Sequence, residues 1–265
     1  MLNPARKPIA RTSALLMRVL VVDPNLMTSK LIAEIIKGMG GRNVNLAGDE
    51  KHAHSVVSQW DPTLIFIEHR GPDLHGEEFV RTLRRSRLPC RRAPVIMLAN
   101  EATAAVIKGA RDSGVHEFIR KPFATGDVIK RVTAISSRPR DWIEAVGYVG
   151  PDRRRFNSAE YVGDRKRSGE SASTPAEIKD RCMRIVESAL SQFDSDPMQA
   201  IRALRAQAQQ LTSVAGKTGD TKLATAAATL EGAVAGGTAT RSLLTPVVER
   251  VLSLRDAAPK ERASA

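Results

Sequence analysis

The 265-residue chain has few aromatic residues, only two cysteines and no long apolar run. Phe, Trp and Tyr make up 4% of it, so aliphatic residues and methionine must fill most of any core. Cys90 and Cys182 lie far apart without metal-ligand spacing, which gives no basis for a disulfide framework or a zinc site. No apolar stretch approaches the roughly 20 residues of a membrane-spanning helix. We therefore expect a cytoplasmic protein with no membrane span, no metal and no cofactor.

Acidic residues are fewer than basic ones: the chain has 29 Asp and Glu and 41 Lys and Arg, which gives a net charge of +12. An excess of this size favours acidic partners, whether nucleic acid, an anionic nucleotide, a membrane surface or an acidic protein face. An arginine-rich proteome would explain the same excess without a specific partner. No helix-turn-helix with a recognition face is visible, so a DNA-binding transcription factor is disfavoured.

Arginine is concentrated over residues 81–92 and in two short runs further along the chain. Its guanidinium group binds phosphates bidentately and stacks on bases. The candidate anion-binding residues are Arg84, Arg85, Arg153, Arg154, Arg155, Arg165 and Arg167. Solvated surface charge and a protein-docking surface are the alternative interpretations of the same residues.

Short apolar runs alternate with segments of helical periodicity in the first half of the chain. The predicted strands cover residues 18–22, 43–47, 63–67, 94–98 and 115–119. The predicted helices cover residues 26–39, 49–60, 76–87, 101–113 and 124–135. This alternation predicts an α/β fold, a doubly wound five-stranded parallel sheet covered on both faces. The functional crevice of such a sheet lies outside the carboxyl ends of its strands.

The second half of the chain changes from a polar, arginine-rich stretch without periodicity to amphipathic helical segments. Four such segments with short connections are typical of an all-α four-helix bundle, whose last helix we expect to be interrupted or restarted at Pro246. Met17 is an alternative start of the chain. The predicted organisation is a disordered tail (1–16), the α/β domain (17–138), an arginine-rich linker (139–173), the C-terminal helical bundle (174–258) and a second tail (259–265).

The predicted strand ends carry a distinctive set of residues. Val21-Val-Asp23 closes the first strand, Phe66-Ile-Glu68 the third, and Leu98-Ala99 the fourth, while Phe118-Ile-Arg-Lys121-Pro122-Phe123 closes the fifth. In order and spacing, residues 18–137 resemble the response-regulator receiver family, of the chemotaxis-regulator type. The resemblance implies a flavodoxin-like fold in which an aspartate accepts a phosphoryl group from a phosphohistidine. It also implies a cis peptide bond before Pro122 that positions the lysine.

The chain departs from the receiver pattern at the positions that take part in phosphoryl transfer. The resemblance places Glu68 at the acceptor position, Pro24 at the second acidic position, and Ala99 at the hydroxyl position. Glu68 is one methylene longer than aspartate, and Pro24 removes a carboxylate ligand for Mg²⁺ beside Asp23. Ala99 cannot hydrogen-bond a phosphoryl oxygen. We therefore expect a pseudo-receiver without phosphoryl transfer and without enzymatic activity.

Lys121 is retained, and Phe118 stands at the position of the switch aromatic residue without a hydroxyl. Two interpretations of Glu68 stay open. Its longer carboxylate reaches Lys121 and holds an active-like state, or the pair is a structural ion pair or drift in a disused site. The loss of both hydroxyls favours the second interpretation, because nothing remains to couple the site to the aromatic residue.

A pattern of small residues marks the predicted second helix of the bundle. Ala208-Gln209-Gln-Leu-Thr-Ser-Val-Ala215-Gly216-Lys-Thr-Gly219, followed by Leu230-Glu231, resembles the histidine-phosphotransfer family. That resemblance implies a bundle in which an exposed histidine carries a phosphoryl group. Gln209 stands at this position and has no nucleophilic imidazole. An alanine-rich helical hairpin gives the same pattern, and a dimerisation bundle is a further alternative.

We therefore predict a phosphorylation-independent, two-component-type signalling adaptor that acts by protein docking. Its expected partners are a histidine kinase, a phosphotransferase or another relay protein, and the bundle is a candidate surface for a homodimer. The alternative is a regulator that binds a cyclic dinucleotide, an anionic second messenger, through the arginine-rich segments.

Overall fold

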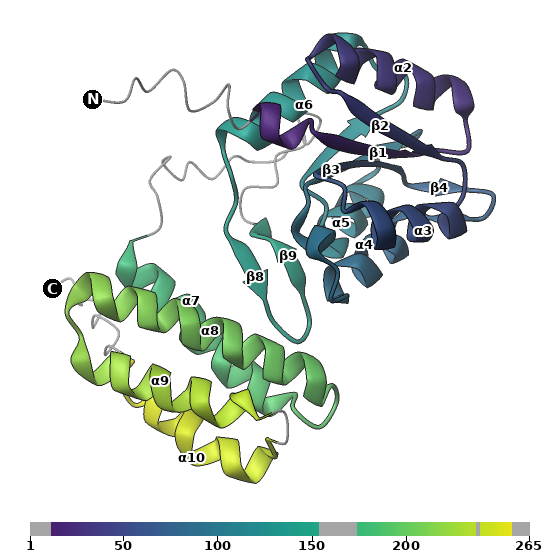
Figure 1. The fold of residues 1–265 in the computed structure, drawn as a ribbon. Coiled ribbons are helices and arrows are strands. Elements are labelled where there is room, and N and C mark those ends of the chain that lie inside the picture. Colours follow the sequence, from purple (N-terminus) through teal and green to yellow (C-terminus); the bar gives the residue numbers. More distant parts are fainter. Residues whose placement is uncertain (1–11, 154–173, 237–238, 256–265) are drawn as a thin grey trace, which may run out of the picture. The chain divides into compact units, whose positions relative to one another are not determined.

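The computed structural model describes residues 12–153, 174–236 and 239–255, which divide into two compact units (Figure 1). Of the described residues, 12–143 and 148–153 belong to the first unit, and 144–147, 174–236 and 239–255 belong to the second. Among the described residues, no helix combines the length and apolar character needed to cross a membrane.

Five parallel strands form the centre of the first unit. They are β1 (Arg18–Val22), β2 (Asn43–Ala47), β3 (Leu64–Glu68), β6 (Val95–Ala99) and β7 (Glu117–Arg120). Their order in the sheet is β2-β1-β3-β6-β7. The direction of winding therefore reverses between β1 and β3, which is where ligands bind in sheets of this kind. The predicted doubly wound parallel sheet is confirmed.

Helices and short connections join these strands. The helices are α2 (Leu26–Gly38), α3 (Glu50–Trp60), α4 (Gly76–Arg85), α5 (Ala104–Ser113) and α6 (Thr125–Ser137). A small antiparallel pair, β4 (Arg70–Gly71) and β5 (Leu74–His75), separates β3 from α4, and the 3₁₀ turn η1 (Pro89–Arg92) precedes β6.

Each face of the sheet has its own apolar core, because successive side chains of a strand point to opposite faces. On one face, Leu20 and Ile65 pack with buried residues of α3, α4 and α5. On the other face, Val21 and Phe66 pack with α2 and α6, which lie on the same side of the sheet (Figure 1). Aliphatic residues fill most of both cores, as the shortage of aromatic residues requires.

Two ordered segments of the first unit differ from the predicted tail and linker. Leu16, which we assigned to a disordered tail, is 1% exposed, and residues 12–15 are helical. Residues 139–153 include a hairpin of β8 (Trp142–Glu144) and β9 (Val149–Pro151) where a linker was predicted. Strands of three residues are too short to show an alternating pattern in the sequence. The rest of the predicted linker lies outside the described residues.

The hairpin is anchored in the first unit by its aromatic side chains. The guanidinium groups of Arg84, Arg91 and Arg92 each lie within 5.6 Å of the centre of the Trp142 ring. Tyr148 is buried and donates its hydroxyl hydrogen to the carbonyl of Pro151 at 2.6 Å. Cation–π contacts of this kind contribute about 0.5–2 kcal/mol each, so they stabilise a segment that has little apolar area of its own.

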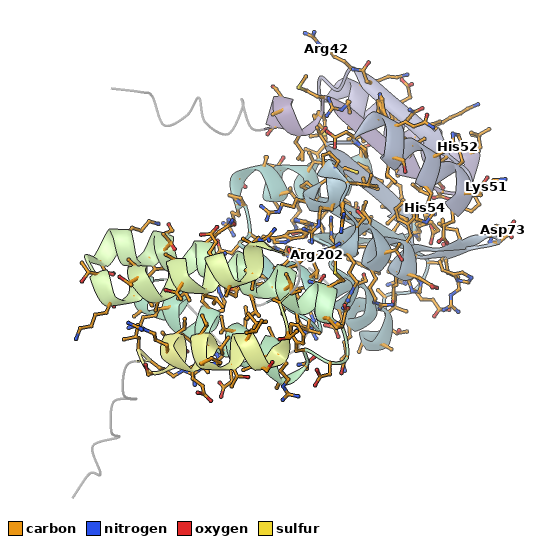
Figure 2. All side chains as sticks on the ribbon, turned by 60° about the horizontal axis from the view of Figure 1, so that its bottom comes forward. Arg42, Lys51, His52, His54, Asp73 and Arg202 are labelled. Atoms are coloured by element: carbon orange, nitrogen blue, oxygen red, sulfur yellow. The ribbon has the colours of Figure 1, made fainter. Side chains whose placement is uncertain are left out.

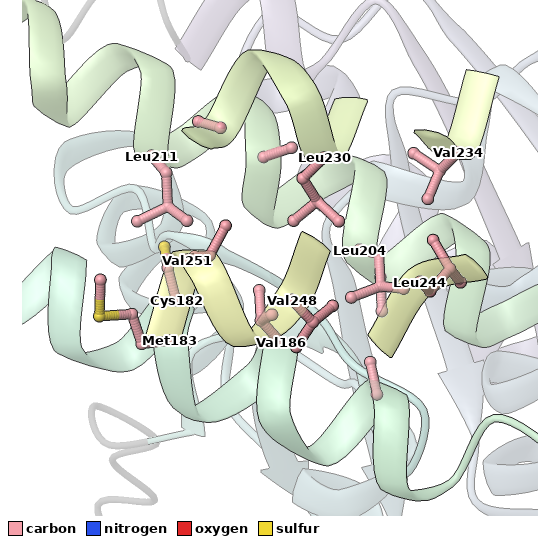
Figure 3. Packing of buried hydrophobic residues seen from close by; sticks show 14 of the residues in the cluster. Cys182, Met183, Val186, Leu204, Leu211, Leu230, Val234, Leu244, Val248 and Val251 are labelled. Atoms are coloured by element: carbon pink, nitrogen blue, oxygen red, sulfur yellow. The ribbon is translucent and has the colours of Figure 1, made fainter. Parts of the chain in front are cut away.

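Four helices form the second unit: α7 (Pro175–Ser191), α8 (Pro197–Thr218), α9 (Thr221–Ala235) and α10 (Arg241–Leu252). Leu204, Leu211 and Leu230 pack with smaller apolar side chains in their shared core (Figure 3). The helical region that the sequence predicts is therefore present. Pro246 lies inside α10 and does not interrupt it, contrary to our expectation. Proline has no N–H, so the carbonyl of Ser242 has no helical donor. Both residues are exposed, and water can supply the missing hydrogen bond.

Residues 144–147, at the turn of the hairpin, belong to the helical unit. Val146 joins its apolar core, and the backbone carbonyl of Glu144 accepts a hydrogen bond from Gln207 Nε2 at 3.1 Å. The Glu144 carboxylate accepts another from Gln199 Nε2, also at 3.1 Å. These two buried glutamines could not be expected from the sequence, because an isolated Gln on a helix is usually exposed.

Candidate functional site

The carboxyl edge of the sheet brings together the residues that sequence analysis singled out. Asp23 directly follows β1, Glu68 ends β3, Ala99 ends β6, and Lys121 directly follows β7. The peptide bond between Lys121 and Pro122 is cis, as the receiver resemblance implies. These four positions surround the crevice where the winding of the sheet reverses.

Lys121 is the centre of a buried ion-pair cluster in this crevice. Its Nζ donates a hydrogen bond to Asp23 Oδ2 at 2.7 Å and another to Glu68 Oε2. Asp23 is 3% exposed and Glu68 is 4% exposed. The longer side chain of Glu68 therefore reaches the lysine from the end of β3.

The remaining carboxylate oxygens are also satisfied by the protein. Asp23 Oδ1 accepts a hydrogen bond from the backbone N–H of Asn25 at 2.8 Å. Glu68 Oε1 accepts one from the backbone N–H of His69 at 3.1 Å. All four oxygens of the two acids thus have a donor within the chain. A cation at this edge would compete with the Lys121 ammonium group for the same two carboxylates.

Burial and pairing shift the pKa values of this cluster. Burial raises the pKa of Glu68, and the hydrogen bond and charge of Lys121 oppose this rise without cancelling it. Burial lowers the pKa of Lys121, but its hydrogen bonds and Coulombic attraction to Asp23 and Glu68 outweigh that effect and raise it overall. A lysine held charged by two carboxylates is a stable arrangement at neutral pH.

Pro24 removes one carboxylate ligand from a magnesium site at this edge, and Lys121 competes for the two carboxylates that remain. Mg²⁺ prefers near-octahedral oxygen coordination with one or two carboxylates. Pro24 supplies no carboxylate, and its ring packs against Gly71, where an added Cβ would lie 2.6 Å from Pro24 Cγ. Among the described residues, no cluster of three or more His, Cys, Asp or Glu side chains is placed to hold a metal ion.

The two positions that lack a hydroxyl are buried. Ala99 is 1% exposed, and its carbonyl accepts a hydrogen bond from the backbone N–H of Lys121 at 2.8 Å. Phe118 lies in the core formed with α3, α4 and α5. Neither side chain can donate to a phosphoryl oxygen, and the aromatic ring already has apolar neighbours.

An exposed apolar patch begins immediately beside the crevice. Leu26, Met27 and Leu31, on the first turns of α2, are 55%, 75% and 48% exposed. Asn25 caps this helix and follows Asp23 by two residues, so the patch borders the ion-pair cluster. Sequence analysis missed the patch as a functional feature. The helical spacing of the sequence indicates this patch, because it places Met27 on the opposite face of the helix from the buried Ile32 and Ile36.

Gln209 lies on the exposed side of α8 in the helical unit. Its Nε2 donates a hydrogen bond to Glu231 Oε1 of α9 at 3.1 Å. The two residues that the phosphotransfer resemblance singled out on these helices are therefore in contact. A neutral amide in this position links the two helices by one exposed hydrogen bond and offers no nucleophile.

The arginine prediction is wrong for Arg84. Its guanidinium is completely buried, and it donates hydrogen bonds to the carbonyls of Gly114, Arg91 and Ala93. Burial lowers its pKa to about 9. Arg153 is exposed but pairs with Asp112 at 2.9 Å and lies over the Tyr148 ring at 4.3 Å.

Arg85 is half-buried on α4. The other candidates, Arg154, Arg155, Arg165 and Arg167, lie outside the described residues. The candidate anion-binding arginines are thus not brought together within the part of the chain that the structure describes.

Comparison with known proteins gives one domain match. Residues 19–133 match the family model described as the response regulator receiver domain. The transcriptional regulatory protein PdtaR of Mycobacterium tuberculosis is 24% identical over 145 residues, which are 55% of this chain and 69% of PdtaR. The DNA-binding response regulator MtrA of Mycolicibacterium paratuberculosis is 29% identical over 125 residues, 47% of this chain. This match spans 53% of the MtrA chain, about half of its length.

Solved structures of receivers resemble the first unit. A CheY-like receiver domain from Methanospirillum hungatei has 18% sequence identity and a TM-score of 0.42, and the match covers 46% of this chain and 94% of that one. The family match confirms the receiver resemblance for residues 19–133. The helices α7–α10 lie beyond this match.

Proposed function

Because residues 19–133 form a response regulator receiver domain, we propose that the chain is a two-component-type signalling adaptor that docks its partner without phosphoryl transfer. The observation that carries this proposal is the closed crevice. Every carboxylate oxygen of Asp23 and Glu68 accepts a hydrogen bond from the protein, and Lys121 is shared between them.

Phosphoryl acceptance would require this cluster to open. A carboxylate nucleophile must approach the phosphorus in line, with cations and donors placed around the transferred oxygens. Displacing Lys121 would leave two buried carboxylates without their shared cation, and breaking such a pair costs about 3–5 kcal/mol. This cost is not compensated, because Ala99 has no hydroxyl and Pro24 has no carboxylate. The geometry therefore favours a structural ion pair over an acceptor site.

The patch of Leu26, Met27 and Leu31 supplies a docking surface next to the closed crevice. Clustered exposed apolar side chains mark interaction sites more often than scattered ones do. Lys30 lies within the same turns of α2, so an apolar stripe with an acidic rim would match this surface. The proposed partner is a histidine kinase or a phosphotransferase that presents a helical face of this chemistry.

The helical unit is proposed to be a phosphotransfer-like bundle that has also lost its chemistry. The contact between Gln209 and Glu231 supports this, because it spans the two helices that carry the family pattern. In this account the bundle offers a second docking surface, or pairs with a second copy of the chain. Both units then keep a recognition surface of the relay without its reactive group.

Affinity capture with the full chain as bait tests the docking proposal. The double variant M27S/L31S is expected to weaken binding of the captured kinase or phosphotransferase about five- to thirtyfold, because two exposed anchors at an interface contribute roughly 1–2 kcal/mol together. The amount is measured by quantitative mass spectrometry. Adding the phosphoryl mimic beryllofluoride with Mg²⁺ is expected to change nothing.

The matched control is M17S. Met17 is 56% exposed in the same unit, but it lies before β1, at the opposite edge of the sheet from Met27. Equal loss of the partner in M17S would show that exposed methionines in general, and not this patch, are responsible. Capture that occurs only with beryllofluoride would contradict a phosphorylation-independent adaptor.

A further inference from the structure

A cavity of the receiver unit is lined by arginine. It has a volume of about 200 Å³, and its walls include Arg92, His116, Glu117, Arg138 and Arg140. Arg92 ends the turn before β6, and His116 directly precedes β7. The cavity therefore lies at the amino edge of the sheet, opposite the edge that carries Asp23 and Lys121. Its volume exceeds by more than tenfold the roughly 10–15 Å³ that one water needs.

The charge around this cavity is strongly positive. Three guanidinium groups and one carboxylate line it, and that carboxylate is already paired. Glu117 accepts a hydrogen bond from Arg131 Nη1 at 3.1 Å and one from Arg140 Nη2 at 2.8 Å. The lining residues alone carry a net charge of about +2 at neutral pH, because His116 is neutral there.

His116 adds a neutral donor to the wall of the cavity. Its Nδ1 lies 3.3 Å from the backbone nitrogen of Val95 and 3.4 Å from Arg84 Nη2. Both neighbours can only donate, so Nδ1 is the acceptor and the ring hydrogen is on Nε2. Burial, followed by the charges of Arg84 and Arg140, lowers the pKa of His116 well below its ordinary value.

We propose that this cavity binds a small anion that carries phosphate groups, of the size of a diphosphate. Planar guanidinium groups bind phosphate oxygens bidentately, and partial enclosure strengthens each charge-assisted hydrogen bond. The walls come from η1, the start of β7 and the segment after α6, so a bound anion joins three elements of the domain. The site is independent of the docking surface, since it lies at the opposite edge of the sheet.

Nuclear magnetic resonance of the histidine side chains in the full chain tests this site, with inorganic pyrophosphate as the probe. Saturable shifts of the His116 ring signals are expected at constant ionic strength. The bound anion is also expected to raise the pKa of His116, because negative charge nearby favours the imidazolium. The signals of the other four histidines are assigned by substituting each of them in turn with glutamine. The remaining signals then belong to His116.

Two variants separate a built site from general attraction to a basic protein. R92Q/R138Q removes two exposed guanidinium groups of the wall and is expected to weaken pyrophosphate binding at least about tenfold. R42Q removes an exposed arginine that extends away from the domain (Figure 2) and is expected to leave the affinity unchanged. An unchanged far-ultraviolet circular dichroism spectrum of each variant shows that the chain is folded, whereas tryptophan fluorescence is unsuitable because Arg92 lies over the Trp142 ring.

A second arm compares pyrophosphate with a nucleoside diphosphate. Tighter binding of the nucleotide identifies a nucleotide as the ligand, and equal binding identifies the diphosphate group alone; both support the site. The proposal is overturned if the His116 signals show no saturable shift up to about 10 mM pyrophosphate. It is equally overturned if R42Q weakens binding as much as R92Q/R138Q does.

Discussion

Replacing Arg84 with methionine is expected to lower the free energy of unfolding of the receiver unit by about 3 kcal/mol. Methionine keeps much of the side-chain volume but cannot donate to the carbonyls of Gly114, Arg91 and Ala93. Each buried carbonyl left without a donor costs about 1–3 kcal/mol, and relief from burying a charge returns part of that sum. Urea unfolding followed by tryptophan fluorescence measures the loss.

The fluorescence signal is specific to this unit, because both tryptophans of the chain, Trp60 and Trp142, belong to it. R81M is the matched control on the same helix. The Arg81 side chain is 51% exposed and lies 3.9 Å from a Glu77 oxygen, so its loss is expected to cost less than about 0.5 kcal/mol. If R84M and R81M unfold at the same urea concentration, the buried arginine does not stabilise the domain.

The triple variant P24D/E68D/A99T is expected to accept a phosphoryl group from acetyl phosphate in the presence of Mg²⁺. The changes restore a second carboxylate, a shorter acceptor and a hydroxyl at the carboxyl edge of the sheet. An acceptor misplaced by about 1 Å can lose about 100-fold in rate, so shortening Glu68 is the essential step. Intact mass spectrometry is expected to show an increase of about 80 Da, the mass of a phosphoryl group.

The control for this gain is P24D/E68N/A99T, which has the same surroundings but no nucleophilic carboxylate. It is expected to show no adduct. An adduct on this control would place the modification elsewhere in the chain. A folded triple variant without an adduct would mean that the loss of transfer chemistry has a cause other than these three positions.

The sheet was predictable because its strands and helices alternate regularly and each strand is strongly apolar. The crevice was predictable for the same reason, since the carboxyl ends of parallel strands meet at one edge. Contact between Glu68 and Lys121 followed from their places at this edge and from the extra methylene of glutamate. That Lys121 would also bind Asp23 depends on side-chain conformation, which the sequence does not specify.

The burial of Arg84 illustrates where sequence reasoning was insufficient. The run of arginines after residue 80 suggested a continuous basic surface. Arg84 nevertheless follows Val80 by four residues and lies on the same helical face as Phe79 and Leu83, which are buried. That spacing was visible, but its meaning depended on three carbonyls supplied by Gly114 and by the turn around Arg91. Partners so distant in the sequence cannot be inferred from a local pattern.

The two interpretations of Glu68 have different consequences for signalling. A mimic of the active state needs a hydroxyl that couples the site to the switch position, and neither Ala99 nor Phe118 supplies one. Phe118 is 2% exposed and packs with the strand and helix residues around it. Together with the hydrogen bonds that Lys121 donates to Asp23 and Glu68, the missing hydroxyls favour the structural ion pair.

The most direct test of this account is the intact mass of the wild-type chain after incubation with acetyl phosphate and Mg²⁺. The account predicts an unchanged mass, because the oxygens of Glu68 and Asp23 are held by Lys121 and by backbone N–H groups. A stoichiometric increase of about 80 Da that disappears in Glu68→Ala would contradict it, because Glu68 would then be a working phosphoryl acceptor.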